Sequence, residues 1–121
     1  MDANRIVEEF CAAWGRADLD HIMNSFAEDA IYHNIPMAPC QGKAEIENFI
    51  KGFIAGSPDG IEFAVKHQVA KGNVVINERV DTLVMEGKEV ALPVCGVFEV
   101  DGNGKIAAWR DYFDMGAFQG S

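Results

Sequence analysis

The chain has 121 residues, of which 49% are hydrophobic, and its formal net charge at pH 7 is −9. This length predicts one domain, residues 1–121, with enough apolar residues for a single core. The negative charge argues against nucleic acid or an anionic membrane surface as a partner. No apolar run reaches the roughly 18 residues of a membrane-spanning helix, and no signal sequence is recognisable, so we expect a cytoplasmic protein. Its three cysteines are far apart, which argues against a disulfide framework or a zinc site.

The first half of the chain is predicted to be mainly helical. Apolar residues recur at helical spacing in three segments, and Asp18 is placed to cap the second of them. The inner face of this second helix includes Met23 and Phe26. We expect three helices, over residues 4–14, 19–26 and 43–55, and one short strand, over residues 30–34.

The second half of the chain is predicted to be all strand. Apolar and polar residues alternate in four segments, which cover residues 61–70, 75–83, 89–100 and 106–114. Short glycine-containing turns join these segments, so they should form an antiparallel meander. In the first of them, His67 falls on the apolar face, which predicts a core histidine. Three helices followed by four such strands indicate an α+β fold, with helices packed on a sheet.

Charged residues interrupt the apolar face of two of these strands. In the last strand Asp111 shares a face with Trp109 and Phe113, and in the second strand Arg79 and Asp81 stand among apolar neighbours. A carboxylate is costly to remove from water unless it has partners. The two strands are one strand apart in the meander, roughly 10 Å between their axes. We therefore predict that the three charged side chains meet in one pocket.

Two carboxylates with an arginine between them can act as an acid and a base if their environments differ. The alternative is a buried salt-bridge cluster with a structural role, and the spacing alone leaves both possibilities open. Tyr32 and Asn34 share one face of the first strand, where they can either bind a water molecule or serve in ordinary packing and turn formation. The sequence has no nucleophile elbow, phosphate-binding loop or H-E-x-x-H motif.

Three short motifs occur in a diagnostic order. They are the YHNIP sequence at residues 32–36, ERVD at residues 78–81 and WRDYFD at residues 109–114, with Gly-Val-Phe at residues 96–98 between the last two. Together they resemble the limonene epoxide hydrolase family over about residues 18–118. That family belongs to the superfamily of nuclear transport factor two and ketosteroid isomerase. The resemblance implies a cystatin-like α+β fold: a cone-shaped, curved, mixed or antiparallel sheet with three N-terminal helices on its concave side.

The resemblance also implies an activity, the hydrolysis of a small lipophilic epoxide to a vicinal diol in one step. No covalent intermediate, cofactor or metal is expected. Asp111 would be the base and Asp81 the acid, Arg79 would orient both, and Tyr32 and Asn34 would position the attacking water. Simultaneous proton removal and donation suits epoxide opening, because the leaving alkoxide is basic. Superfamily members commonly pair through the outer sheet face, so a homodimer is expected.

The predicted substrate-binding residues are apolar side chains from the helices and the strands. They are Met23, Phe53, Leu83, Leu92, Val94, Trp109 and Phe113. Two other functions remain as alternatives. One is a proton-transfer enzyme similar to ketosteroid isomerase or a polyketide cyclase, and the other is a non-catalytic domain that binds a small apolar ligand.

Overall fold

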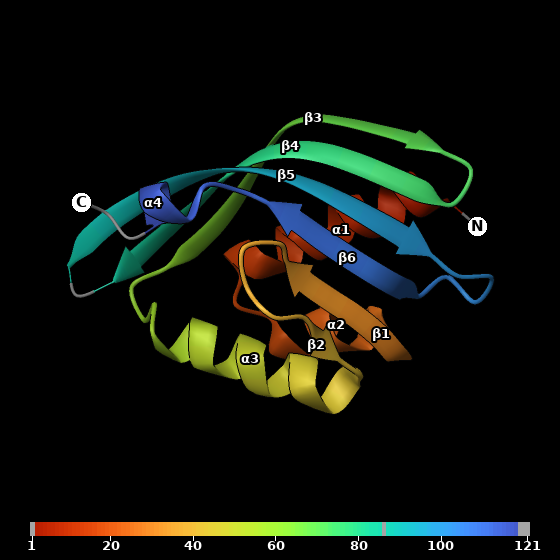
Figure 1. Ribbon diagram of the computed structural model, residues 1–121, viewed down its shortest axis with the longest axis horizontal. Helices are drawn as coiled ribbons and strands as arrows, with labels where there is room; N and C mark the ends of the chain where they lie inside the picture. The colour runs from red at the N-terminus through yellow and green to blue at the C-terminus, as the bar shows by residue number, and fades with distance from the viewer. Residues whose placement is uncertain (1, 86, 119–121) are drawn as a thin grey trace.

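The computed structural model describes residues 2–85 and 87–118. Helices lie on one side of a curved, open sheet of six strands, as Figure 1 shows. In chain order the elements are α1 (Ala3–Gly15), α2 (Leu19–Asn24), β1 (Phe26–Asn34), β2 (Cys40–Gln41), α3 (Lys43–Ala55), β3 (Ile61–Lys71), β4 (Val74–Met85), β5 (Lys88–Val100), β6 (Ile106–Tyr112) and α4 (Met115–Phe118). None of the described helices is long and apolar enough to cross a membrane.

The sheet has the strand order β2-β1-β6-β5-β4-β3. Strands β3 to β6 form the predicted antiparallel meander, whereas β1 runs parallel to β6. The sheet is therefore mixed, and the expected α+β fold is confirmed. Helix α3 has the predicted bounds, and the Asp18 side chain caps α2 by accepting a hydrogen bond from the His21 backbone N–H at 3.1 Å.

The boundary between α2 and β1 differs from the prediction. Helical spacing had included Phe26 in the second helix, but α2 ends at Asn24 and Phe26 begins β1. Phe26 is the register partner of Ile106, whose backbone N–H donates to the Ser25 carbonyl at 2.8 Å. Phe26 and Ile106 are 80 residues apart in the chain. This long-range strand pairing outweighs the helical periodicity of the local sequence. The short elements β2 and α4 were not predicted.

The prediction that His67 is a core residue was wrong. The register of β3 against β4 shifts between Val65 and His67, which marks a bulge. The His67 side chain is consequently 83% exposed and pairs with Glu78 at 2.9 Å. Gln68 takes the inner position and donates a hydrogen bond to the Asn4 carbonyl of α1 at 2.9 Å. Alternation with a period of two residues cannot reveal a bulge.

Aromatic side chains fill the core between α1 and the sheet. Trp109 of β6 is fully buried at its centre. Its ring packs edge-on against Phe10 of α1, with centroids 5.0 Å apart, and stacks on Phe98 of β5 and Tyr32 of β1 at 5.5 and 4.1 Å. Such packing from three sides leaves the indole one orientation. Trp109 thereby gives Asp111, two residues further along β6, a rigid support.

Candidate active site

Arg79 of β4 lies between the two aspartates predicted to share its pocket. Its Nε and Nη2 atoms donate to the Asp81 carboxylate at 3.0 and 2.8 Å. Its Nη1 and Nη2 atoms donate to the Asp111 carboxylate at 3.3 and 2.9 Å. The arginine is fully buried, with 0% exposure. The structure thus brings together the three charged side chains that the strand alternation had placed on one face.

The remaining contacts of Arg79 fix the plane of its guanidinium group. Nη1 also donates to the Asn77 side-chain oxygen at 3.1 Å. The group lies over the ring of Phe63, 4.7 Å from its centroid, where a cation–π attraction adds to the hydrogen bonds. Five hydrogen bonds to three residues match the five N–H donors of an arginine.

The two aspartates differ in the donors they receive. Asp111 accepts a 2.6 Å hydrogen bond from Trp109 Nε1 in addition to its two bonds from Arg79. Asp81 is bonded to Arg79. Burial raises the pKa of both carboxyl groups above the usual value, and the arginine partly opposes this increase.

The charge of the cluster also matters. Burial alone would lower the pKa of Arg79, but the charges of Asp111 and Asp81 outweigh it and hold this pKa well above the ordinary range. The arginine is therefore a permanent cation. A buried group of one cation and two carboxyls is neutral when one carboxyl is ionised and the other protonated, and a net buried charge is costly. The arrangement thus favours one base and one acid.

Tyr32 and Asn34 lie on β1, beside Asp111. Asn34 is the register partner of Asp111 across the parallel β1–β6 pair. The Tyr32 hydroxyl donates to the Asn34 side-chain oxygen at 3.2 Å. Burial, followed by the charge of Asp111, raises the pKa of Tyr32 well above the usual value, so the phenol stays neutral. Its oxygen can still accept a hydrogen bond, and the Asn34 amide can donate one, which suits a water molecule held next to Asp111.

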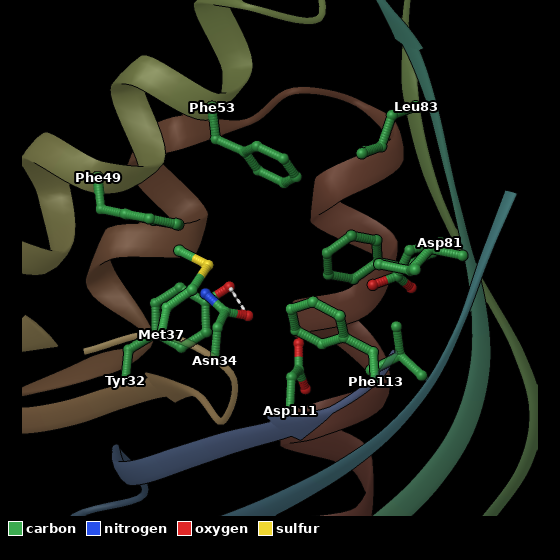
Figure 2. Close-up of a pocket in the computed structure, with 12 residues that line it drawn as sticks. Tyr32, Asn34, Met37, Phe49, Phe53, Asp81, Leu83, Asp111 and Phe113 are labelled. Atoms are coloured by element: carbon green, nitrogen blue, oxygen red, sulfur yellow. Dashed lines mark hydrogen bonds between the residues drawn. The ribbon is translucent and has the colours of Figure 1, made fainter. Parts of the chain in front are cut away.

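These groups border an apolar pocket of about 270 Å³. Phe49 and Phe53 of α3 face Asp81 and Asp111 across it, as Figure 2 shows. The lining residues are Tyr32, Asn34, Met37, Phe49, Phe53, Phe63, Asp81, Leu83, Leu92, Val94, Asp111 and Phe113. Apolar walls exclude water and strengthen the electrostatic interactions at the carboxylates.

Five of the seven apolar residues predicted to bind substrate line this pocket, and two do not. Met23 lies in the core on α2, which packs against α1 and β1. Trp109 lies beneath Tyr32 and Asp111, with its ring in the core and its N–H on the carboxylate. Both residues are buried in the core, and Tyr32 stacks on the Trp109 ring and covers it.

Three lining residues were missed. Phe49 precedes Phe53 by one helical turn, so the helical spacing could have identified it. Phe63 is the register partner of Asp81 and could have been found from the pairing of β3 with β4. Met37 lies in the loop after β1, where no periodic signal exists.

The chain is similar to known proteins in sequence and in structure. The sequence model of the limonene-1,2-epoxide hydrolase catalytic domain matches residues 1–119. Epoxide hydrolase EphG of Mycobacterium tuberculosis is 33% identical over 109 residues, which are 90% of this chain and 71% of that protein. A solved LEH-like epoxide hydrolase of M. tuberculosis is 34% identical and superposes with a TM-score of 0.86, covering 98% of this chain and 87% of that one.

More distant structures share the fold. A SnoaL-like polyketide cyclase fold from Shewanella denitrificans superposes with a TM-score of 0.87 over 97% of this chain and 93% of the other, at 15% identity. This similarity concerns the fold alone.

Within residues 2–85 and 87–118, no three His, Cys, Asp or Glu side chains gather closely enough to hold a metal ion.

Proposed function

We propose that this chain, which belongs to the limonene-1,2-epoxide hydrolase family, hydrolyses a small lipophilic epoxide to a vicinal diol by direct attack of water. The observation that carries the proposal is the buried Asp81–Arg79–Asp111 bridge at the edge of an apolar pocket. An apolar ligand bound there would meet a proton donor, a proton acceptor and a polar pair that can hold water.

The donors around each carboxyl suggest which is the base. Asp111 accepts hydrogen bonds from both Arg79 and Trp109, and donors stabilise the ionised form. Asp111 is also next to Asn34, where the attacking water would be held. Asp81 has the arginine as its partner, so it is the better site for the shared proton. We assign Asp111 as the general base and Asp81 as the general acid.

The proposed reaction takes one step. The water oxygen forms a bond to an epoxide carbon while the bond from that carbon to the ring oxygen breaks. The ring oxygen takes its proton from Asp81, and Asp111 takes a proton from the water. Epoxide and water become a diol, Asp111 ends protonated and Asp81 ends ionised. The net charge of the buried cluster is unchanged, so the step avoids charge accumulation in an apolar site. A proton must return from Asp111 to Asp81 before the next turnover.

We further propose that the protein forms a homodimer through the outer face of the sheet. Val69 and its register partner Ile76 lie on that face as apolar residues exposed by 65% and 41%. Light scattering on the purified chain should give twice the monomer mass. A single-chain mass at micromolar concentration would contradict this assembly.

Turnover of a small epoxide panel tests the proposed activity. Limonene oxide, cyclohexene oxide and styrene oxide are incubated with the protein, and the diols are quantified by mass spectrometry. We expect diol from at least one substrate, and none above background from Asp111→Asn. Asp114→Asn is the matched control, because Asp114 is exposed just beyond β6. If the folded parent protein forms no diol, the proposal is wrong, and a carbonyl-acid proton exchange assay would then test the isomerase-like alternative.

A further inference from the structure

We infer that Gly96 of β5 is a positioning residue for the buried bridge, because the space of its missing side chain is where the Arg79 guanidinium crosses β5 to reach Asp111. The effect of Gly96 on the Arg79–Asp111 contact follows from the geometry of strands β4, β5 and β6. Its consequence for catalysis rests on the function proposed above.

The strand registers place Gly96 between the two partners. Gly96 pairs with Asn77 on β4 and with Asp111 on β6. Strand β5 separates β4 from β6, so any side chain at this position on the inner face would stand between Arg79 and Asp111. The inner positions of β5 on either side of Gly96 are filled by buried apolar side chains, those of Leu92, Val94 and Phe98.

A side chain at position 96 would collide with the bridge. An ideal Cβ atom built on Gly96 would lie 2.5 Å from Arg79 Nη1, 2.9 Å from Asp111 Oδ1 and 3.0 Å from Asn77 Oδ1. Non-bonded heavy atoms settle at about 3.5–4.0 Å. Arg79 cannot move aside cheaply, because it is fully buried and held by five hydrogen bonds. Even a methyl group must therefore displace the guanidinium or the carboxylate.

Backbone geometry provides no other reason for a glycine here. Gly96 lies in the middle of β5, and its φ is not positive. The irregularity in the β5–β6 pairing falls between Glu99 and Val100, away from this residue. A glycine inside a strand normally weakens it. The close approach of the Arg79, Asp111 and Asn77 side chains is the feature of this site that requires one.

Disturbing this crossing should weaken Asp111 as a base. The colliding atom, Nη1, makes one of the two hydrogen bonds from Arg79 to Asp111 and neither of the two to Asp81, which come from Nε and Nη2. A Cβ at position 96 would thus weaken the hold of the cation on Asp111 more than its hold on Asp81. Less stabilisation of the carboxylate makes it harder to ionise. The other titratable groups that act on this cluster are Tyr32 of β1 and Cys11 of α1, and both are expected to stay neutral because burial raises the pKa of Tyr32 well above its usual value and that of Cys11 to about 12.

A double-mutant cycle, read as urea stability, tests whether a side chain at position 96 collides with the Arg79 guanidinium, and it needs no substrate. Gly96→Ala is made in the parent chain and in an Arg79→Lys variant, whose ammonium lacks the Nη1 atom that the new methyl group would meet. We expect Gly96→Ala to lower the urea midpoint of the parent more than that of Arg79→Lys, in which the close contacts with Asp111 Oδ1 and Asn77 Oδ1 remain. Cys95→Ala is the control, because its exposed side chain points to the outer face of the same strand. If Gly96→Ala alone fails to fold while the double variant folds, the same conclusion follows. Equal effects in both backgrounds would overturn the inference.

A pH titration followed by NMR measures the ionisation of Asp111, which a general loss of stability would not change. The Trp109 indole N–H donates to Asp111 at 2.6 Å, so its NMR signal should follow the ionisation of that carboxyl. Trp14→Phe assigns the signal by removing the other indole. We expect the titration midpoint to move to higher pH in Gly96→Ala and to stay in place in Cys95→Ala. An unmoved midpoint in the folded Gly96→Ala protein would overturn the inference.

Kinetics then connect the position to the reaction. Displacement of a catalytic group by about 1 Å can cost about 100-fold in rate, so we expect a loss of this order in kcat with little change in KM. Retention of the parent kcat by folded Gly96→Ala would contradict a positioning role. If the parent protein turns over no epoxide, the proposed function fails, while the stability cycle and the indole titration still decide the role of Gly96.

Discussion

Arg79 Nη2 lies 2.9 Å from Asp111 Oδ2, although Arg79 is on β4, Asp111 is on β6, and β5 runs between them. The contact is possible because the sheet is curved and because Gly96 leaves room where the side chains cross. A buried ion pair therefore joins two strands that share no backbone hydrogen bonds. The geometry of the proposed active site depends on the curvature of the whole sheet, which the pairing of neighbouring strands alone does not show.

Removal of the proposed acid should affect poor leaving groups most. In Asp81→Asn we expect kcat to fall about 10²- to 10⁴-fold for alkyl-substituted epoxides, as for the loss of a general acid. Epoxides with an electron-withdrawing substituent give a less basic alkoxide and should lose less. The measurement is kcat across such a series, with Asp114→Asn as the control. An equal loss for all substrates would argue against proton donation by Asp81.

Removal of the arginine should destabilise the fold. Arg79→Ala leaves two buried carboxyls facing each other, and breaking such a buried pair costs about 3–5 kcal/mol. The loss should shrink at low pH, where both carboxyls are protonated. Arg110→Ala is the matched control, since Arg110 pairs with Glu99 at 2.8 Å in a partly exposed position and such pairs contribute about 0–1 kcal/mol. Urea unfolding at neutral and acidic pH measures both variants. An Arg79→Ala protein as stable as the parent would contradict the buried bridge.

The raised pKa of Asp111 predicts how stability depends on pH. Burial holds this pKa above its ordinary value of 3.8, so the folded chain binds the proton more tightly than the unfolded chain does. The stability from this group is therefore complete below pH 3.8 and decreases as the pH rises through the folded pKa. Asp111→Asn does not titrate, so its unfolding free energy should improve relative to the parent over that interval. A relative stability that falls with rising pH would contradict the direction.

The Trp109 N–H, rather than its aromatic ring, should influence the ionisation of Asp111. Trp109→Phe keeps an aromatic ring in the core but removes the donor to Asp111, so the acidic limb of the kcat/KM profile should move to higher pH. Loss of this hydrogen bond to a charged group should lower the free energy of unfolding by about 1.5–3 kcal/mol. Trp14→Phe is a close control, because Trp14 is also buried but its Nε1 has no hydrogen-bond partner among the described residues. Similar pH profiles for the two variants would show that the Trp109 N–H does not influence the ionisation of Asp111.

Met37 is expected to act on substrate binding rather than on chemistry. It lines the pocket from the loop after β1 and is 36% exposed, so its loss should hardly affect stability. Met37→Ala should raise KM for bulky lipophilic epoxides and leave kcat nearly unchanged, because the lost apolar contact would stabilise bound substrate and transition state alike. Met37→Leu, which preserves the volume, should restore KM. A selective loss of kcat would place Met37 in the catalytic geometry instead.

Much of the fold was predictable because its local signals agree. Helix α3 begins and ends at the predicted residues, and the meander follows from alternating strands and short turns. The sequence also indicated that Arg79, Asp81 and Asp111 share the inner face, since a strand leaves no other choice once its apolar residues are buried. The extent of β1 was not predictable locally, because the start of this strand pairs with β6, near the end of the chain.

The pocket was less predictable than the charged cluster. Whether an apolar residue lines a cavity or fills the core depends on which neighbour covers it, and Trp109 and Phe113 show the difference. Both were assigned to one face, but Trp109 is covered by Tyr32, whereas Phe113 borders the cavity. Gly96 shows the same limit in reverse. It belongs to the Gly-Val-Phe sequence that contributed to the family resemblance, but the side chains for which it leaves room lie on two other strands, so the sequence did not show why a glycine stands there.

A single-turnover experiment in oxygen-18 water tests most directly whether water itself attacks the epoxide. The protein is used in excess over an epoxide that it hydrolyses, and the mass of the diol is measured by mass spectrometry after one turnover. We predict diol that carries one oxygen-18 atom, because the water held by Asp111, Tyr32 and Asn34 supplies the new hydroxyl group. Unlabelled diol from the first turnover would show that an oxygen of the protein attacked the epoxide, and it would contradict the one-step mechanism.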